Sequence, residues 1–309
     1  MTLRDGRFAI DDAAYSARGV NYYPAHYPWR RFLTESDPES VRDELLLLHT
    51  AGFNTLRIFL WNAALFSCDG RGITPNAEAF GRLDSVIQGA AAQGFRLVVT
   101  LNDIPADDIY SNPAYQQTQT RLIVERYKDE AAILAWDVRN EGDIDYGSND
   151  TFGRGKFAKE TVLDWLKQTT DAVGGLDSQH LITAGWLKDS EATAPDVDFL
   201  SFHHWDDAGK LHERIAGMRA ANKPILLEEF GYSTSRMSPE DQSRTIAEII
   251  QASDAENLLG WLIWTAFDFP LDATCIRPAC PSQDNAEHHF GLWLPDYTPK
   301  PAVEMLLGR

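Results

Sequence analysis

The sequence of 309 residues predicts a (β/α)8 TIM barrel, an α/β fold that fills chains of this length as a single domain. Three observations lead to this fold class. Short apolar runs typical of buried strands alternate with amphipathic helical segments along the chain. The connections are short, and many of the runs end in polar or aromatic residues. No Gly-rich phosphate turn follows the first run, which disfavours a doubly wound open sheet as the alternative.

The first half of the chain begins with a short antiparallel element. Residues 5–18 alternate around Asp5-Gly6 and Asp11-Asp12, which predicts a hairpin that could plug the N-terminal end of the barrel. The strands expected next are residues 18–24, 52–62, 95–103 and 133–142, and the helices between them are residues 38–51, 79–93 and 113–130. Gly94 follows the second helix and is expected to cap it.

The second half repeats this alternation. Its expected strands are residues 180–186, 197–205, 223–231 and 258–268, and its expected helices are residues 156–173, 210–220 and 239–252, with a final helix after Pro301. Ser238 precedes Pro239 and is an N-cap candidate for the helix that starts there. Residues 1–309 are therefore expected to form one catalytic barrel domain.

Composition limits the partners of the chain. A formal net charge of −18 repels nucleic acid and anionic membranes. No apolar run approaches the roughly 18–20 residues of a membrane span. The N-terminal residues lack the apolar core of a signal peptide, so we expect either a cytoplasmic protein or a mature form whose leader is absent. We expect a monomer, in which Cys275 and Cys280 could bridge within one Pro-rich loop and leave Cys68 free.

Two of the expected strands carry a carboxylate near their C-terminal end. Residues 133–142 contain Glu141, and residues 223–231 contain Glu228 and Glu229. In such barrels the C-terminal tips of strands face the active-site mouth. An isolated Asn-Glu pair is more often a helix cap or a solvated carboxylate, but the same design on a second strand favours a pair of catalytic groups.

Other strand tips carry side chains suited to carbohydrates. They are Asn21, Arg57, Trp61, Asn102, Asn140, Trp186, His203, Trp205 and Trp264. Indole rings stack on the C–H faces of sugars, while amides and guanidinium groups bond their hydroxyls. A mouth with two carboxylates above such a floor has the groups that glycoside hydrolysis requires.

Several motifs of the sequence together resemble one known family. They are Gly19-Val20-Asn21, Gly52-Phe53-Asn54-Thr55-Leu56-Arg57, Trp136-Asp137-Val138-Arg139-Asn140-Glu141, Phe202-His203-His204-Trp205, Glu228-Glu229-Phe230-Gly231 and Trp264. Over nearly its whole length the chain is similar to clan A glycoside hydrolases of family 5, which include cellulases and β-mannanases. The resemblance implies that Glu141 is the acid/base and that Glu229, rather than Glu228, is the nucleophile of a retaining double displacement. Alternation agrees, since neighbours on a strand face opposite sides.

The resemblance also implies a substrate class. The run from Asp198 to His203, the run from Leu227 to Gly231 and Asn102 favour the mannanase branch, and thus β-1,4-mannan or a mannoside. Two features depart from the family: Gly142 follows Glu141, and Trp205 stands where a Tyr usually supports the nucleophile. An indole supplies no hydroxyl. An endo-β-1,4-glucanase and an exo-β-glycosidase of the same family therefore remain alternatives.

The resemblance further implies roles for the neighbouring side chains. Arg57 would hold Glu229 ionised, Asn140 would bond the sugar 2-hydroxyl, and Trp264 would form the floor, with His203 beside the carboxylates. Asn21, Trp61, Asn102 and Trp205 are the other expected substrate-binding residues. No metal and no cofactor are expected. The separation of the two carboxyl groups is expected to be about 5 Å, as in retaining enzymes.

Two rival classes keep part of this pattern. A non-catalytic sugar-binding barrel would keep the Trp residues without needing both carboxylates. A metal-dependent barrel hydrolase could use His203, His204, Asp206 and Glu229, but adjacent His residues on a strand point apart, and the first strand lacks a His-x-His pair. The loop 271–289 follows the last strand, and we expect it to form a wall at the rim of the site.

Overall fold

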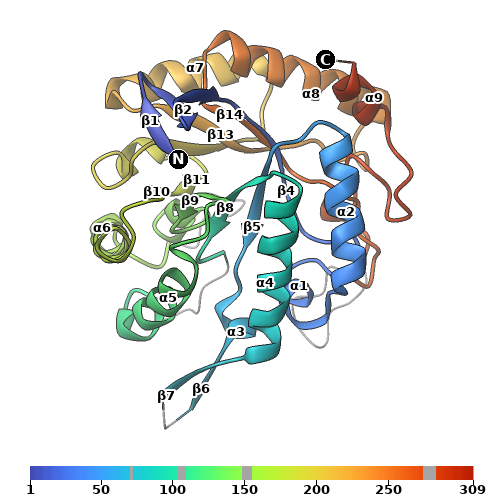
Figure 1. The fold of residues 1–309 in the computed structure, drawn as a ribbon. Helices are drawn as coiled ribbons and strands as arrows, with labels where there is room; N and C mark the ends of the chain where they lie inside the picture. Colours follow the sequence, from blue (N-terminus) through green and yellow to red (C-terminus); the bar gives the residue numbers. More distant parts are fainter. Residues whose placement is uncertain (70–71, 104–108, 148–154, 274–282, 309) are drawn as a thin grey trace.

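A sheet of parallel strands surrounded by helices forms the centre of the computed structural model (Figure 1), which describes residues 1–69, 72–103, 109–147, 155–273 and 283–308. The sheet has nine strands in the order β10-β9-β8-β5-β4-β14-β13-β12-β11. Their bounds are β4 (Ala17–Asn21), β5 (Thr55–Phe59), β8 (Arg96–Thr100), β9 (Ile133–Asp137), β10 (Leu181–Thr183), β11 (Gly185–Trp186), β12 (Leu200–His204), β13 (Ile225–Phe230) and β14 (Gly260–Ile263).

One chain segment closes this sheet into a barrel. Only Ala184 separates β10 from β11, yet β10 pairs with β9 at one edge of the sheet and β11 pairs with β12 at the other. The two short strands are thus halves of the predicted strand 180–186. The nine strands correspond to the eight that the sequence predicts, and the predicted (β/α)8 barrel is confirmed.

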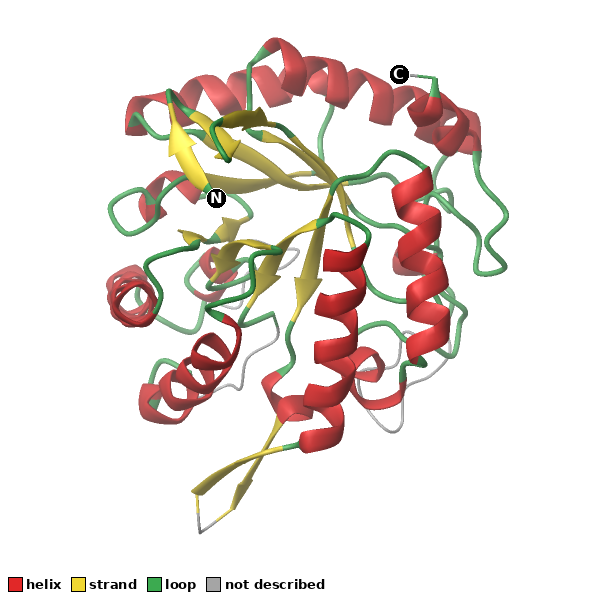
Figure 2. Cartoon of the chain, viewed as in Figure 1, coloured by secondary structure: helices red, strands yellow, loops and turns green. Residues whose placement is uncertain are grey.

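The helices lie on the outside of the barrel (Figure 2), and their ends fall within three residues of the predicted ones. They are α2 (Pro38–Thr50), α4 (Ala77–Ala92), α5 (Pro113–Tyr127), α6 (Lys159–Leu176), α7 (Ala208–Met218), α8 (Pro239–Ala255) and α9 (Pro301–Leu307). The Ser238 hydroxyl accepts the backbone N–H of Asp241 at 3.1 Å, which confirms the predicted N-cap. Gly94, at φ +81°, takes the left-handed conformation that ends α4.

The N-terminal residues form more than the predicted hairpin. β1 (Thr2–Arg4), β2 (Arg7–Ile10) and β3 (Ala13–Tyr15) make an antiparallel sheet of three strands. Phe8 from this sheet is fully buried and meets Phe199 edge to face at 5.1 Å. Both belong to a separate apolar cluster with Val98, Leu134 and other side chains of the barrel strands. The sheet therefore closes the base of the barrel, as the plug hypothesis expects.

Short elements that the sequence does not predict occupy the loops between strands and helices. They are α1 (Arg30–Glu35), α3 (Asn62–Leu65), the hairpin of β6 (Phe66–Asp69) and β7 (Gly72–Pro75), and the 3-10 helices η1 (Gly142–Asp145), η2 (Ser190–Thr193) and η4 (Ala286–His288). A further 3-10 helix, η3 (Arg219–Ala221), continues α7 at the end of the predicted helix 210–220. The β6–β7 hairpin projects beyond the ring of helices (Figure 1). Between β11 and β12 the chain makes only the single turn η2 in place of a full helix.

Two further expectations concern membranes and cysteines. In the described part of the chain, no helix combines the length and apolar character that a membrane span needs. Cys68 is exposed and forms no disulfide. Cys275 and Cys280 lie outside the described residues, so their pairing stays a prediction.

Candidate active site

Glu141 projects from a strained turn between β9 and η1. Its backbone lies in the left-handed region, at φ 47° and ψ 43°, and its N–H donates to the carbonyl of Gly185 at 2.7 Å. Non-glycine residues seldom adopt this conformation unless their surroundings hold them there. A Cβ on the next residue, Gly142, would lie 2.9 Å from the indole nitrogen of the buried Trp186. This close contact explains why the chain has glycine after Glu141.

Glu229 comes from β13, at a place where the strand is irregular. The pairing register of β13 shifts against β12 and again against β14, between Leu227 and Phe230. Glu228 Oε2 lies 3.7 Å from Arg57 Nη2, and Glu229 Oε2 lies 2.8 Å from Arg57 Nη1. Both side chains therefore lie close to the same guanidinium, but only Glu229 lines the cavity, as the alternation predicts. The irregular register explains why the Glu228 carboxyl group nevertheless comes near Arg57.

Arg57 holds the polar centre of the barrel together from β5. Its guanidinium donates to Glu229, to Asp137 Oδ2 at 2.7 Å, to Asn140 Oδ1 at 2.8 Å and to Asn21 Oδ1 at 3.1 Å. The group is fully buried, and burial opposes its charge, but the carboxylates of Glu228, Asp137 and Glu229 hold its pKa well above the usual range. Arg57 therefore stays a cation beside Glu229, as the family pattern implies.

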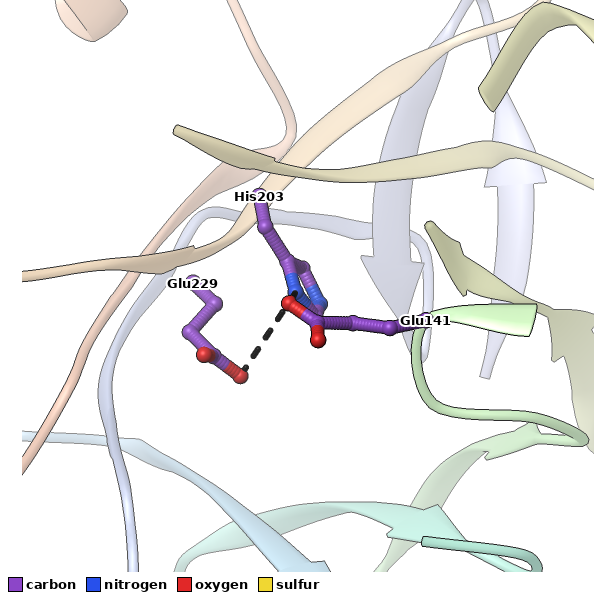
Figure 3. Close-up of side chains that lie close together, drawn as sticks. All are labelled: Glu141, His203 and Glu229. Carbon is purple, nitrogen blue, oxygen red and sulfur yellow. Dashed lines mark hydrogen bonds and ion pairs between the residues drawn. The ribbon is translucent and has the colours of Figure 1, made fainter. Parts of the chain in front are cut away.

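His203 lies between the two carboxylates (Figure 3). Its Nδ1 is 2.9 Å from Glu141 Oε1 and 3.8 Å from Glu229 Oε2. One polar atom of each of the three side chains lies within 4.8 Å of the others. This spacing fits the roughly 5–5.5 Å of retaining glycosidases better than the roughly 6.5–9.5 Å that an inverting enzyme needs to admit a water.

The three groups share protons unequally. Burial raises the pKa of Glu229 to about 7, against the opposing effect of His203 and Arg57. Burial alone would lower the pKa of His203, but the carboxylates around it raise that pKa to about 10. Burial raises the pKa of Glu141, but the hydrogen bond and charge of His203, together with the charges of Arg57 and Arg139, outweigh it and lower that pKa. In the empty site the shared proton thus lies on the imidazole side of the 2.9 Å contact, and proton donation by Glu141 requires its transfer to Oε1.

The raised pKa of Glu229 predicts a stability gain for Glu229→Gln. The pKa of Glu229 is about 7 in the folded protein, against 4.5 for a free Glu. Between these two pH values the folded state binds more protons than the unfolded state, so the wild type loses stability as the pH rises from one to the other. Gln does not titrate. The Tm of the variant minus that of the wild type should therefore grow by several degrees across this window and then level off, as calorimetry at a series of pH values can measure. A difference independent of pH would contradict the raised pKa.

A cavity of about 770 Å³ opens above the two carboxylates. Its lining includes five residues that the sequence predicts for the site, namely Asn140, Glu141, Trp205, Glu229 and Trp264. Asn21, Arg57 and His203 are fully buried beneath this lining and reach the cavity only through the groups that they bond. Glu228 is also fully buried and is absent from the lining.

Two predicted residues, Asn102 and Trp61, do not belong to the lining of the cavity. Asn102 donates to the carbonyl of Val138 at 2.9 Å, and its oxygen accepts bonds from Asn62 and Gln116, both at 3.1 Å. Trp61 is buried and donates its indole N–H to the Asp103 carboxylate at 3.1 Å. These geometries give both residues a structural role and do not support direct contact with a sugar.

Asp103 takes the place expected for its neighbour Asn102. It lines the cavity, and its carboxylate accepts the Asn140 amide at 3.0 Å and the Tyr23 hydroxyl at 2.8 Å. Because Arg57 binds the other side of the Asn140 amide, the orientation of that amide is fixed from two directions. Position at the tip of the third strand is a signal for Asp103, but the resemblance to the family favours Asn102.

The loops supply cavity residues that the sequence patterns missed, among them Trp29, Arg236 and Glu287. The Glu287 carboxylate hydrogen-bonds the indole of Trp264. Its loop is tied to the loop after β13, because Ser233 donates to the Ala286 carbonyl at 2.9 Å. The described part of the loop 271–289 therefore contributes to the cavity wall, as predicted, whereas residues 274–282 lie outside the described residues.

The same trio is the candidate that the described residues offer for a metal, since its potential ligand atoms are close together. However, Nδ1 of His203 is engaged with Glu141, and Glu229 is paired with Arg57. A metal ion would have to displace both interactions and would lie against a fixed guanidinium charge. The donor set therefore favours a proton-sharing pair of carboxylates over a metal centre.

Comparison with known proteins supports the family that the sequence motifs resemble. Residues 20–269 match the sequence profile of the family described as Cellulase (glycosyl hydrolase family 5). The chain is 27% identical over 288 residues to mannan endo-1,4-beta-mannosidase A of Podospora anserina, covering 74% of this chain and 73% of that protein.

Solved structures share the fold. A GH5_18 protein from Streptomyces cattleya, in complex with Manβ1-4GlcNAc, superposes with a TM-score of 0.78 at 19% identity, over 95% of this chain and 80% of that one. An exo-beta-1,4-mannosidase from Opitutaceae bacterium strain TAV5 gives a TM-score of 0.83 at 21% identity, over 100% of this chain and 61% of that one.

Proposed function

The chain belongs to glycosyl hydrolase family 5, and from that premise we propose that it hydrolyses β-1,4-linked mannan or manno-oligosaccharides with retention of configuration. The observation that carries this proposal is the arrangement of Glu141 and Glu229 around His203, with polar atoms within 4.8 Å of one another and a cavity above them. The mannan specificity is supported by similarity to the fungal mannan endo-1,4-beta-mannosidase.

The proposed reaction is a double displacement. Glu229 attacks the anomeric carbon while Glu141 gives its proton to the leaving oxygen. Glu141, now a carboxylate, then takes a proton from the water that releases the sugar from Glu229. Contact with the Arg57 guanidinium at 2.8 Å favours the ionised form of Glu229 that attacks.

The other groups of the cavity bind and orient the sugar. Asn140 uses one amide N–H to bond Asp103 and keeps the second for the sugar 2-hydroxyl. Trp264 and Trp205 offer indole faces in the cavity wall on which the sugar rings stack. Trp205 has no hydroxyl group and cannot donate the hydrogen bond that a Tyr would give to Glu229. Arg57 is therefore the direct donor to Glu229.

An exo-acting mannosidase is the second candidate. Arg236 and Glu287 place charged groups in the cavity wall, and such groups can bind the hydroxyls of a chain end. An endo-acting enzyme would instead leave room for sugars on both sides of the carboxylates.

A panel of substrates tests the proposal. Purified protein is given mannan, defined manno-oligosaccharides, carboxymethyl-cellulose and aryl β-glycosides, and the products are separated by chromatography. We expect cleavage of the manno-configured substrates. Release of oligomers from the interior of mannan supports endo action, and release of mannose alone supports exo action. Cleavage confined to the glucan would overturn the mannan assignment, and no cleavage of any substrate would overturn the hydrolase assignment.

The stereochemical course provides a separate prediction. With an aryl β-mannoside, proton NMR of the first-formed sugar should show the β anomer before mutarotation, since two inversions at the anomeric carbon restore its configuration. An initial α-anomer signal would mean that Glu229 activates a water instead of forming a covalent bond. The spontaneous mutarotation rate of mannose, measured in the same buffer, is the control.

A further inference from the structure

Glu228 is a third carboxyl group behind the proposed catalytic pair, and the reaction described above does not use it. Its side chain is fully buried, and neither of its oxygens has a hydrogen-bond partner among the residues that the structure describes. Glu228 Oε2 lies 3.8 Å from Nε2 of His203, and this nitrogen also lacks a partner in the described chain. The ion-pair partners of Glu228, Arg57 at 3.7 Å and His203 at 3.8 Å, lie beyond hydrogen-bond distance. A buried carboxyl group that lacks hydrogen bonds destabilises a fold, so its presence calls for a functional explanation.

Two local features of the backbone accommodate this carboxyl group. The irregular register of β13 brings Glu228 close to Arg57, as Glu229 is. Gly185 in β11 leaves the necessary space, because a Cβ there would lie 1.9 Å from Glu228 Oε2 and 2.9 Å from His203 Nε2. The carboxyl group is thus directed at the side of the imidazole that faces away from Glu141.

We propose that Glu228 is a positioning residue, whose carboxylate keeps the proton of His203 on Nε2 so that Nδ1 is free to share a proton with Glu141. This inference rests on the proposed function of Glu141 as acid/base. With Nε2 protonated, a neutral imidazole accepts the O–H of Glu141 at Nδ1, and Glu141 is then able to act as an acid. In the other tautomer Nδ1–H would donate to Glu141 and hold it as a carboxylate.

The proton count is the same in both steps of the reaction. In the first step the Glu141 proton moves to the leaving oxygen, the glycosidic C–O bond breaks, and a C–O bond to Glu229 forms. In the second step water gives one proton to Glu141 and its oxygen replaces Glu229 at the anomeric carbon. His203 keeps its Nε2 proton throughout.

The charges around this chain of groups are consistent with the inference. Arg57 faces Glu228 from β5, Asp137 from β9 and His203 from β12. Burial raises the pKa of Glu228, whereas Arg57 and His203 oppose this effect. Glu228 is one of the carboxyl groups that raise the pKa of His203 against the effect of burial, and at 3.8 Å from Nε2 it favours a proton on that nitrogen. Glu141 and Glu229 face the same ring, and Arg214 bonds only its backbone carbonyl.

Glu228→Gln tests the inference through its dependence on the leaving group. The change preserves the volume of the side chain and removes its negative charge. The proton of His203 is then no longer held on Nε2, so Glu141 should become a poorer acid. We expect kcat/KM to fall at least about tenfold for manno-oligosaccharides, whose leaving groups need a proton, and to change little for 2,4-dinitrophenyl β-mannoside. The basic limb of the pH profile should move to lower pH, because a negative charge near His203 is lost. An equal loss for both substrates with an unchanged pH profile would overturn the inference.

Two control variants separate positioning from a general structural effect. Glu228→Asp keeps the charge and should recover part of the activity. Glu44→Gln removes another buried carboxyl group, one that bonds Tyr22, Ala25 and Tyr297 away from the cavity. This variant should change the stability of the protein, and any change in kcat/KM should be the same for substrates with good and poor leaving groups. A leaving-group dependence in Glu44→Gln would show that the effect is not specific to Glu228.

Nitrogen-15 NMR of the His203 ring provides a readout that needs no activity. The wild type should carry a proton on Nε2, and Glu228→Gln should move part of that population to the Nδ1–H tautomer. A bare Nε2 in the wild type, or an unchanged tautomer in the variant, would overturn the inference. If the wild type cleaves no glycoside, the proposed function fails, and the NMR measurement still decides whether Glu228 positions the imidazole.

Discussion

Replacing Glu229 with alanine is expected to reduce kcat on every substrate by roughly 10⁴–10⁶-fold, because the group that forms the covalent intermediate is lost. Of the two neighbouring carboxyl groups on β13, only Glu229 lines the cavity in the described structure. Activity is measured on mannan and on an activated aryl β-mannoside, with circular dichroism as a check that the variant is folded.

Added azide shows whether Glu229→Ala loses activity because the nucleophile is missing or for another reason. A small anion can occupy the space left by the Glu229 side chain and attack the anomeric carbon once, which gives an α-glycosyl azide. We expect partial recovery of turnover and this inverted product. A β-azide, or full activity without azide, would contradict the assignment of Glu229.

Replacing Glu141 with alanine is expected to slow hydrolysis of manno-oligosaccharides by roughly 10²–10⁴-fold, since the proton for the leaving oxygen is lost. The first step should remain fast for 2,4-dinitrophenyl β-mannoside, whose leaving group departs as an anion. The second step should still be slow, because no group activates the water. A burst of dinitrophenol in stopped-flow measurements followed by slow turnover is therefore the expected signature.

The product formed with azide again provides the control. Azide can attack the glycosyl–Glu229 intermediate of Glu141→Ala without a general base, which inverts the anomeric carbon a second time and gives a β-azide. The two variants thus yield azides of opposite configuration. An equal loss of rate on good and poor leaving groups would remove Glu141 from the acid role.

Much of the fold was predictable because each element carries a local signal. Alternating apolar runs and helix caps such as Ser238 are properties of neighbouring residues. The absence of a local signal explains why other features of the fold were not predicted. The three-stranded sheet at the N-terminus and the interruption of the fifth strand at Ala184 depend on packing across the barrel. Such contacts join residues far apart in the chain and leave no period in the sequence.

The site was predictable to the level of strand tips, but not to the level of side-chain direction. Glu141, Glu229, Asn140 and Trp264 line the cavity as expected. Asn102 lies beyond the end of β8 and bonds away from the cavity, while Glu228 lies near Arg57 as Glu229 does, because the irregular register of β13 breaks the regular alternation of side chains. Irregularities of this kind arise from pairing with adjacent strands.

The sheet of β1, β2 and β3 that closes the base of the barrel has a practical consequence for attaching the protein to surfaces. Met1 packs against the apolar cluster around Phe8, whereas the candidate catalytic side chains lie at the C-terminal ends of the barrel strands. A bead, an electrode or a fused binding module joined at Met1 would therefore hold the molecule with its cavity directed outward. Insoluble polysaccharide could then reach an immobilised layer without obstruction from the support.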